Sequence, residues 1–105
     1  LSLDDATLEN GCFKVIRGSH VNGCLPGTDD GTQLGGFYTD SNAFDRTNEV
    51  SLEISAGSLV FFNPHIVHGS EPNSTNTQRR AYIITYQPGG LPALKSREIE
   101  NIRVR

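Results

Sequence analysis

The segment FFNPHIVHGSEPNSTNTQRRAYIITYQ, residues 61–87, contains the patterns that decide the fold. It begins with an apolar stretch that carries two of the three histidines of the chain, and a polar stretch rich in turn-forming residues follows. It ends in a run of β-branched and aromatic residues. Apolar runs of this kind, bounded by turn residues, are typical of β-strands. The segment therefore predicts two strands that can pair antiparallel across a polar connection.

The sequence predicts several strands, some before this segment and one at its end. Alternation of apolar and polar residues indicates strands over 12–16 and 50–54, and an apolar run indicates another over 58–62. The run over 79–87 is the strongest strand signal in the chain. No repeats or heptads are present. We therefore expect an all-β chain built from antiparallel strands.

The length of 105 residues suits one domain with a modest core, so we expect residues 1–105 to form a single domain. Residues 21–48 are rich in Gly, Asp, Asn, Thr and Ser and predict a long polar loop. The tail, residues 91–105, is compatible with a short helix or with a frayed end. Because the chain has no methionine and its first residues read like the end of a strand, we expect it to be a piece of a longer protein.

Charge and composition exclude several classes of protein. The net charge is −3, and basic residues cluster only at Arg79 and Arg80 and at the C-terminus, which argues against a nucleic-acid surface. No apolar run approaches the ~20 residues that span a bilayer. Cys12 and Cys24 are too few for a disulfide-stapled secreted module, so we expect both to be reduced in a cytoplasmic protein.

The histidines and arginines of residues 61–87 form a candidate site. Residues two apart on a strand share a face, so His68 and Ser70 point the same way and His65 points to the other side. If 79–87 pairs with this strand, one surface can carry His68, Ser70 and Arg79. Imidazole binds Fe(II), and a guanidinium engages a carboxylate through two hydrogen bonds. Spacing alone leaves open the ordinary alternative, in which the histidine is structural or surface-exposed and the arginine is solvated.

Several motifs in order add a family resemblance. They are ENG at 9–11, GSH at 18–20, AG at 56–57, and HGS at 68–70 with an arginine eleven residues beyond its histidine. Together they make most of residues 1–87 similar to the phytanoyl-CoA dioxygenase family of Fe(II)/2-oxoglutarate oxygenases. The resemblance implies an antiparallel double-stranded β-helix, a jelly-roll or cupin-like fold, of which this chain is the C-terminal portion.

The resemblance also implies roles for particular residues. His68 matches the distal iron ligand, Arg79 matches the arginine that pairs with the far carboxylate of 2-oxoglutarate, and Ser70 matches a hydroxyl that helps to hold that carboxylate. Arg80 is then the outward-facing, solvated neighbour, and His65 is structural or lines the rim. The implied cofactors are Fe(II) and the cosubstrate 2-oxoglutarate, and the implied partners are dioxygen and a small-molecule substrate.

Other polar residues near these motifs have structural interpretations. Gly18, Ser19 and His20 are expected to form a turn and to anchor a lid. Arg17 stands where the commoner family form has proline. Asp4, with its acidic neighbours, is interpreted as a solvated or capping carboxylate.

The iron site implied by the resemblance is incomplete within this sequence. The family's first histidine and its carboxylate come as His-x-Asp, and neither His-x-Asp nor His-x-Glu occurs in the chain. We expect that motif before Leu1, and we therefore expect the isolated chain to bind iron poorly and to be inactive. Residues 21–48, with Phe37, Tyr38 and Phe44, are either a lid over the site or a plain surface loop.

Two alternatives from other classes remain open at this point. One is a non-catalytic jelly-roll module that binds a small polar ligand, and the other is a metal-dependent cupin-type isomerase or hydrolase, which would not need Arg79. The sequence does not distinguish a hydroxylase from a halogenase, nor does it identify the substrate. Exposed strand edges favour self-association.

Overall fold

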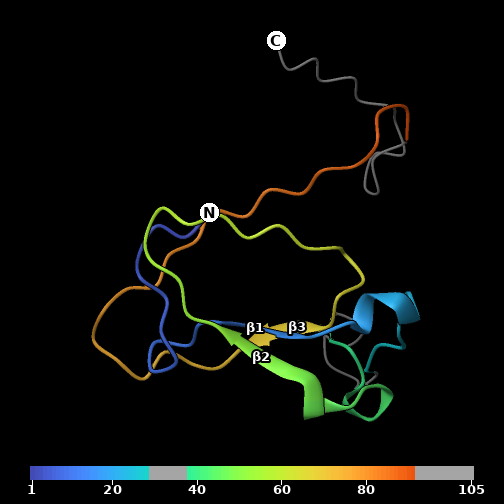
Figure 1. Ribbon diagram of the computed structural model, residues 1–105, viewed down its shortest axis with the longest axis horizontal. Helices are drawn as coiled ribbons and strands as arrows, with labels where there is room; N and C mark the ends of the chain where they lie inside the picture. Colours follow the sequence, from blue (N-terminus) through green and yellow to red (C-terminus); the bar gives the residue numbers. More distant parts are fainter. Residues whose placement is uncertain (29–37, 92–105) are drawn as a thin grey trace.

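In the described part of the chain, a small antiparallel sheet lies beside short 3-10 turns (Figure 1). A computed structural model describes residues 1–28 and 38–91. Its elements are β1 (Phe13–Ile16), η1 (Ser19–Asn22), η2 (Ser41–Ala43), η3 (Arg46–Asn48), β2 (Glu49–Leu52) and β3 (His68–Ser70). β1 is the central strand, with β2 and β3 antiparallel on either side. The strands predicted over 12–16 and 50–54 correspond to β1 and β2.

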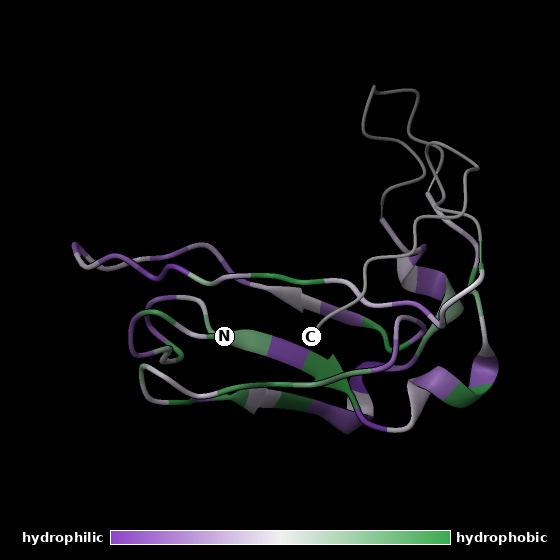
Figure 2. Ribbon diagram, turned by 90° about the horizontal axis from the view of Figure 1, so that it is seen from above, coloured by the Kyte–Doolittle hydropathy of each residue, from purple (hydrophilic) through white to green (hydrophobic). Residues whose placement is uncertain are grey.

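The register of the sheet gives its two faces different chemistry. Val15 of β1 lies opposite Val50 of β2 and His68 of β3, whereas Lys14 lies opposite Gly69. Directly opposed residues project to the same side of a sheet, so His68 shares the face of the valines and Lys14 occupies the other. The alternation along β1 is visible as successive hydrophobic and hydrophilic bands in Figure 2.

The N-terminal residues, 1–12, run along two later segments of the chain. Ala6 pairs with Ile54 through backbone hydrogen bonds in both directions, of 2.8 and 3.0 Å. Ser2 forms an antiparallel bridge with Ala81. These contacts bring the two halves of the chain together although they are separated by up to 79 residues of sequence.

The core of the described residues is small. Its buried apolar side chains are those of Ala6, Cys12, Ile16 and Val67. Cys12 is fully buried and free, and Cys24 is exposed and free, in agreement with the expectation of two reduced cysteines.

The strands predicted over 58–62 and 79–87 are wrong. The latter contributes only the Ala81 bridge, and beyond Tyr82 it runs away from the sheet (Figure 1). β propensity describes how well a residue fits a pleated, half-buried surface, so it does not produce a strand without a neighbouring strand. Residues 1–3 pair with 80–82, but beyond Tyr82 the described residues offer no neighbouring strand, and Ile83 is 82% exposed.

The predicted pairing of 79–87 with the strand of His68 is also wrong, because β3 pairs with β1 instead. Sequence nearness favoured a hairpin across the polar connection of residues 71–78. The structure instead uses a partner more than fifty residues away in sequence.

Parts of the predicted polar loop, 21–48, have defined local structure. The side chain of Asp40 accepts a hydrogen bond from Asn42 N at the start of η2, and that of Asp45 accepts one from Thr47 N at the start of η3. Such capping by short acidic side chains stabilises a helical turn. Phe37 and the tail predicted over 91–105, except Leu91, lie outside the described residues.

The fold class is confirmed at the coarse level: the described residues form an antiparallel β-rich structure with almost no helix. Closure into a double-stranded β-helix and the single domain over 1–105 stay predictions. No helix in residues 1–28 and 38–91 has the length and apolar character to cross a membrane.

Candidate functional site

His68 is the first residue of β3, and its ring has a defined orientation. Its Nδ1 lies 2.8 Å from the backbone oxygen of Ile66. A carbonyl oxygen can only accept a hydrogen bond, so Nδ1 is the donor, and in the neutral ring Nε2 keeps its lone pair. This tautomer is the one that can bind a metal ion through Nε2.

Two aromatic rings restrain the imidazole further. Phe13 and Phe62 each lie with their ring centroid 5.2 Å from that of His68, and 5.1 Å from each other. These tilted arrangements lie within the range that aromatic pairs prefer. The His68 residue is nevertheless exposed, so the ring is held on its sides and open to a ligand.

Ser70 and Arg79 lie beyond His68 along the line of β1. Ser70 is opposite Phe13, two residues along the strand from Val15, the partner of His68. Arg79 donates a hydrogen bond of 3.0 Å from Nε to the backbone oxygen of Asn10, which precedes β1. His68 and Ser70 therefore lie beside β1, and Arg79 contacts the turn that precedes β1.

The guanidinium of Arg79 is held at one atom. Its Nε is bound to Asn10, and no further hydrogen-bond or ion-pair partner of the group occurs within residues 1–28 and 38–91. Arg79 is half-buried. A planar guanidinium fixed through Nε leaves its two terminal nitrogens for a carboxylate.

Arg80 is exposed, as predicted, with 63% of its side chain accessible, but its guanidinium also binds Asp4. Its guanidinium donates two hydrogen bonds, each of 2.9 Å, to the carboxylate of Asp4, and its backbone N donates a third of 2.8 Å. The hydrogen bonds from Arg80 lower the pKa of Asp4 from its ordinary value of 3.8 to about 2. The neighbouring arginines thus have different partners, and Asp4 is a bonded rather than a free carboxylate.

A pH dependence of stability follows from this pair. Because the pKa of Asp4 is lower in the folded state, its contribution is complete above pH 3.8 and is lost as the pH falls towards about 2. We expect Arg80→Ala to lower the melting temperature at neutral pH, and the difference from wild type to vanish in acid. Melting curves of both proteins from about pH 6 to about pH 2 test this. A difference that is constant over this range would contradict it.

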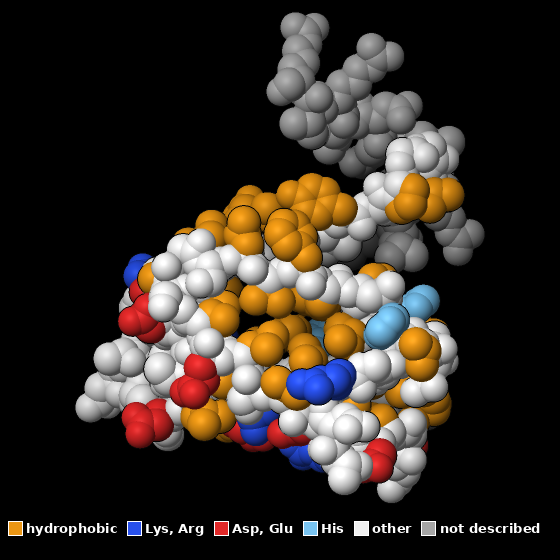
Figure 3. Space-filling model, in the orientation of Figure 1, with side chains coloured by type: hydrophobic (Ala, Val, Ile, Leu, Met, Phe, Trp, Pro, Cys, Tyr) orange, Lys and Arg blue, Asp and Glu red, His pale blue; other side chains and the backbone are white. Residues whose placement is uncertain are grey.

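A cavity of about 300 Å³ adjoins His68. It is lined by Tyr38 and Phe44 from the predicted loop, and by His65. The rim position proposed for His65 and the placement of loop aromatics beside the site therefore agree with the lining of this cavity. In the space-filling view the molecule is hollowed, with hydrophobic side chains lining the hollow and histidine and basic side chains at its margin (Figure 3).

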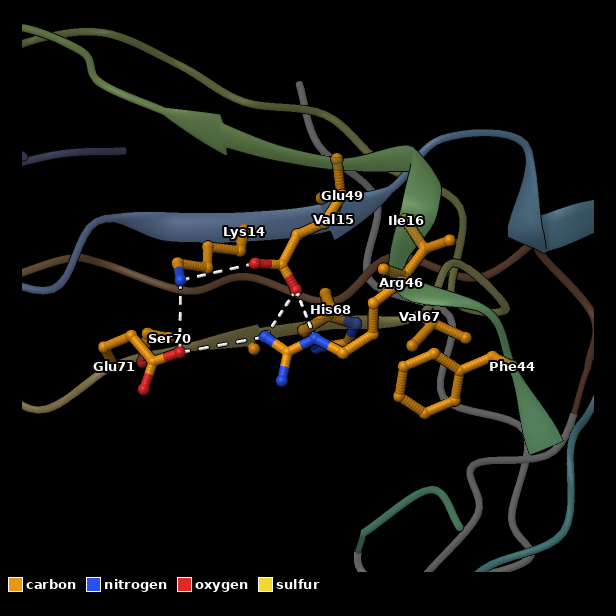
Figure 4. Close-up of a pocket in the computed structure, with 11 residues that line it drawn as sticks. Lys14, Val15, Ile16, Phe44, Arg46, Glu49, Val67, His68, Ser70 and Glu71 are labelled. Atoms are coloured by element: carbon orange, nitrogen blue, oxygen red, sulfur yellow. Dashed lines mark hydrogen bonds and ion pairs between the residues drawn. The ribbon is translucent and has the colours of Figure 1, made fainter. Parts of the chain in front are cut away.

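A second pocket, of about 230 Å³, lies over the charged face of the sheet (Figure 4). Lys14 forms ion pairs with Glu49 and Glu71, at 3.3 and 3.1 Å, and Arg46 hydrogen-bonds to Glu49 at 2.8 Å. The hydrogen bond from Arg46 lowers the pKa of Glu49, and that to Glu71 raises the pKa of Lys14. The charges balance within the cluster, which links β1, β2 and η3 and has the character of a structural network.

Two buried polar residues were not predicted to act on the site. Asn10 is 5% exposed, closes its turn through Thr7 N and Asp5 O, and presents its backbone oxygen to Arg79. Ser19 is also 5% exposed and binds the chain just before His68. The only signal in the sequence was their position in the ENG and GSH turns.

Gly18 of the second turn has φ 79°, and His20 is exposed, consistent with the turn predicted there.

The described residues do not form a complete metal site. In residues 1–28 and 38–91 no three His, Cys, Asp or Glu side chains come together in a way that could hold a metal ion. His68 thus offers one imidazole nitrogen, whereas a facial iron site needs three protein ligands.

Comparison with known proteins gives the family. The family model for phytanoyl-CoA dioxygenase (PhyH) matches residues 1–81. The chain belongs to the phytanoyl-CoA dioxygenase family. Two of the relatives are named as dioxygenases. No solved structure matches the chain.

Three curated relatives show how far the similarity extends. A phytanoyl-CoA dioxygenase of Arabidopsis thaliana is 35% identical over 84 residues, which cover 80% of this chain and 30% of the relative. A phytanoyl-CoA dioxygenase domain-containing protein 1 homolog of Dictyostelium discoideum is 29% identical over 93 residues, covering 84% and 33%. A 2-aminoethylphosphonate dioxygenase of an uncultured bacterium is 33% identical over 86 residues, covering 82% and 30%. The chain spans about a third of the length of these relatives.

Proposed function

We propose that this chain provides the distal iron histidine and the cosubstrate clamp of an Fe(II)/2-oxoglutarate-dependent dioxygenase that hydroxylates a small organic or acyl substrate. The observation that carries the proposal is the 2.8 Å contact between His68 Nδ1 and the Ile66 carbonyl, which favours a proton on Nδ1 of the neutral ring. It leaves Nε2 with the lone pair that an iron ligand needs. Membership of the family supplies the chemical context.

The positions of Ser70 and Arg79 support 2-oxoglutarate as the cosubstrate. A hydroxyl and a guanidinium beyond the imidazole match a ligand whose near end lies at a metal and whose far end is a carboxylate. The two terminal nitrogens of Arg79 would bind that carboxylate as a fork, while Asn10 holds Nε. The role of these two residues is to bind 2-oxoglutarate and to orient it.

Iron requires ligands that the described residues do not include. We propose that the family's His-x-Asp comes from sequence outside residues 1–105 of the same protein. When bound, iron and 2-oxoglutarate would together supply the oxidation of a substrate carbon by dioxygen. The residues of this chain hold His68 and the far carboxylate in place, and the aromatics Tyr38 and Phe44 limit access of water to the cavity beside His68.

The relatives are named for substrates as different as phytanoyl-CoA and 2-aminoethylphosphonate. We propose dioxygen and a small molecule as partners, a cytoplasmic location, and self-association of the isolated chain through exposed strand edges.

The test is the release of succinate from 2-oxoglutarate by the complete protein that contains this chain. We expect release that depends on Fe(II), and none from residues 1–105 alone. His68→Ala should reduce it by more than about a hundredfold, because even residues behind the metal ligands change activity by 10–100-fold. His20→Ala is the matched control, because His20 is exposed and does not line the cavity beside His68, and it should retain most of the activity.

Other outcomes would favour the alternatives. Binding of small ligands without any succinate would favour a non-catalytic jelly-roll module. Metal-dependent turnover of a substrate without 2-oxoglutarate would favour a cupin-type isomerase or hydrolase. Tight one-to-one binding of iron by the isolated chain would contradict the need for ligands from elsewhere.

A further inference from the structure

The turn at Gly18 and η1 contains a buried serine that contacts the segment leading into β3. Ser19 is 5% exposed, and its Oγ accepts a hydrogen bond of 2.8 Å from the backbone N of Val67. The contact joins residues 48 positions apart in sequence. Figure 1 shows the chain entering β3 close to η1, which begins at Ser19.

The N–H that Ser19 binds belongs to the same peptide unit as the carbonyl that binds His68. The amide between Ile66 and Val67 is planar, so its N–H and its C=O cannot rotate independently. Ser19 holds the N–H end at 2.8 Å, and the C=O end accepts from His68 Nδ1, also at 2.8 Å. One rigid plane therefore connects the serine hydroxyl to the imidazole.

This connection has two physical consequences. First, the orientation of the plane decides whether the Ile66 oxygen lies where the imidazole can reach it. Second, hydrogen bonds at both ends of one amide polarise each other, so the bond from Ser19 strengthens the carbonyl as an acceptor for Nδ1–H.

A neighbouring contact keeps the rest of this segment in place. The backbone oxygen of Val67 accepts a hydrogen bond of 2.9 Å from Ile16 N, and Val67 itself is buried. Ile16 therefore fixes the peptide that follows Val67, whereas Ser19 fixes the one that precedes it. Only the preceding peptide carries the carbonyl that binds the imidazole.

We propose that Ser19 is a positioning residue for His68, which acts through the Ile66–Val67 peptide and keeps the proton on Nδ1. The consequence for iron rests on the proposed function, but the consequence for the tautomer does not. Without the hydroxyl, the buried Val67 N–H loses its acceptor and the plane is released. The His68 ring then populates the tautomer protonated at Nε2, which cannot bind a metal through that atom.

The test measures the tautomer directly, by nitrogen NMR of the complete protein with labelled histidines, at about pH 8.5 where imidazole is neutral. Wild type should show His68 protonated at Nδ1. Ser19→Ala should shift the ratio of the two tautomers by about three- to tenfold, the range that one buried hydrogen bond supports. His65 in the same spectra serves as an internal reference and should not change.

Two further variants separate positioning from stability. Ser19→Thr keeps the hydroxyl and should restore the wild-type ratio. Ser2→Ala is the matched control, because Ser2 is also buried, at 7% exposed, and its hydroxyl donates a hydrogen bond of 2.7 Å to the backbone oxygen of Asp4. It should lower the melting temperature without changing the His68 tautomer.

The proposal is overturned if Ser19→Ala lowers stability as Ser2→Ala does and leaves the tautomer of His68 as in wild type. Binding of Fe(II) by the same proteins gives the second readout, and the dissociation constant should rise in Ser19→Ala alone, by the same three- to tenfold factor. If the wild-type protein binds no iron, the proposed function fails, and the NMR result still decides the role of Ser19.

Discussion

Replacing Arg79 by alanine should raise the Michaelis constant for 2-oxoglutarate by about a hundredfold, because removing one member of a buried charged hydrogen-bond pair costs roughly 2–5 kcal/mol. The guanidinium is half-buried and tied to Asn10 through Nε, so its terminal nitrogens are already oriented before a ligand arrives. A preorganised donor pair loses little entropy on binding, and for this reason we expect the effect on affinity to be large. Steady-state kinetics of succinate release with varied 2-oxoglutarate measures it.

The neighbouring arginine provides the control for this experiment. Arg80→Ala removes a cation of the same kind at the next position, but its guanidinium is bound to Asp4. We expect Arg80→Ala to lower thermal stability and to leave the Michaelis constant for 2-oxoglutarate within about twofold of wild type. The exposed ion pair of Arg80 with Asp4 contributes only to stability. Equal Michaelis constants for wild type and Arg79→Ala would show that Arg79 is not the clamp.

Local sequence patterns were sufficient to predict β1 and β2. Both are short period-2 segments whose alternation matches the two faces of a sheet. The shared face of His68 and Ser70 follows from the same periodicity and is present in β3. These features depend only on residues that are adjacent in sequence, which is why a single sequence is enough to predict them.

The partners of the strands could not be predicted in this way. The segment near Ile83 has a high β propensity but lies exposed, because pairing depends on which backbone edge is nearby and not on the side chains of the segment itself. Likewise, β3 pairs with β1 across more than fifty residues. A hairpin with the following segment was the local alternative, and the structure does not contain it.

The contacts that prepare the candidate site are long-range as well. Asn10 reaches Arg79 across 69 positions, and Ser19 reaches Val67 across 48. In each contact one of the two hydrogen-bonding groups belongs to the backbone. Every residue carries such a group, so the sequence does not indicate which residue is the partner. The histidine and the arginine of the candidate site could therefore be singled out from the sequence, whereas the groups that orient them became apparent only in three dimensions.

Gly11→Ala should destabilise the protein by about 3 kcal/mol, the sum of the strain of a left-handed backbone and of an overpacked contact. Gly11 has φ 79°, and a Cβ built there would overlap the backbone oxygen of Glu71 and lie 3.1 Å from its carbonyl carbon. The backbone of residue 71 cannot easily retreat, because it directly follows β3. Denaturant unfolding of wild type and variant measures the difference.

A substitution at Gly57 distinguishes the strain of the left-handed backbone from the overpacked contact. It has a similar φ of 85°, but a Cβ there would meet nothing within 4 Å. Gly57→Ala should therefore cost only the backbone strain, about 1 kcal/mol. If both variants lose the same stability, the close approach of Gly11 to Glu71 has no energetic weight. If Gly11→Ala loses clearly more, the ENG turn is packed against the end of β3, and the turn that holds Arg79 is coupled to the strand that carries His68 and Ser70.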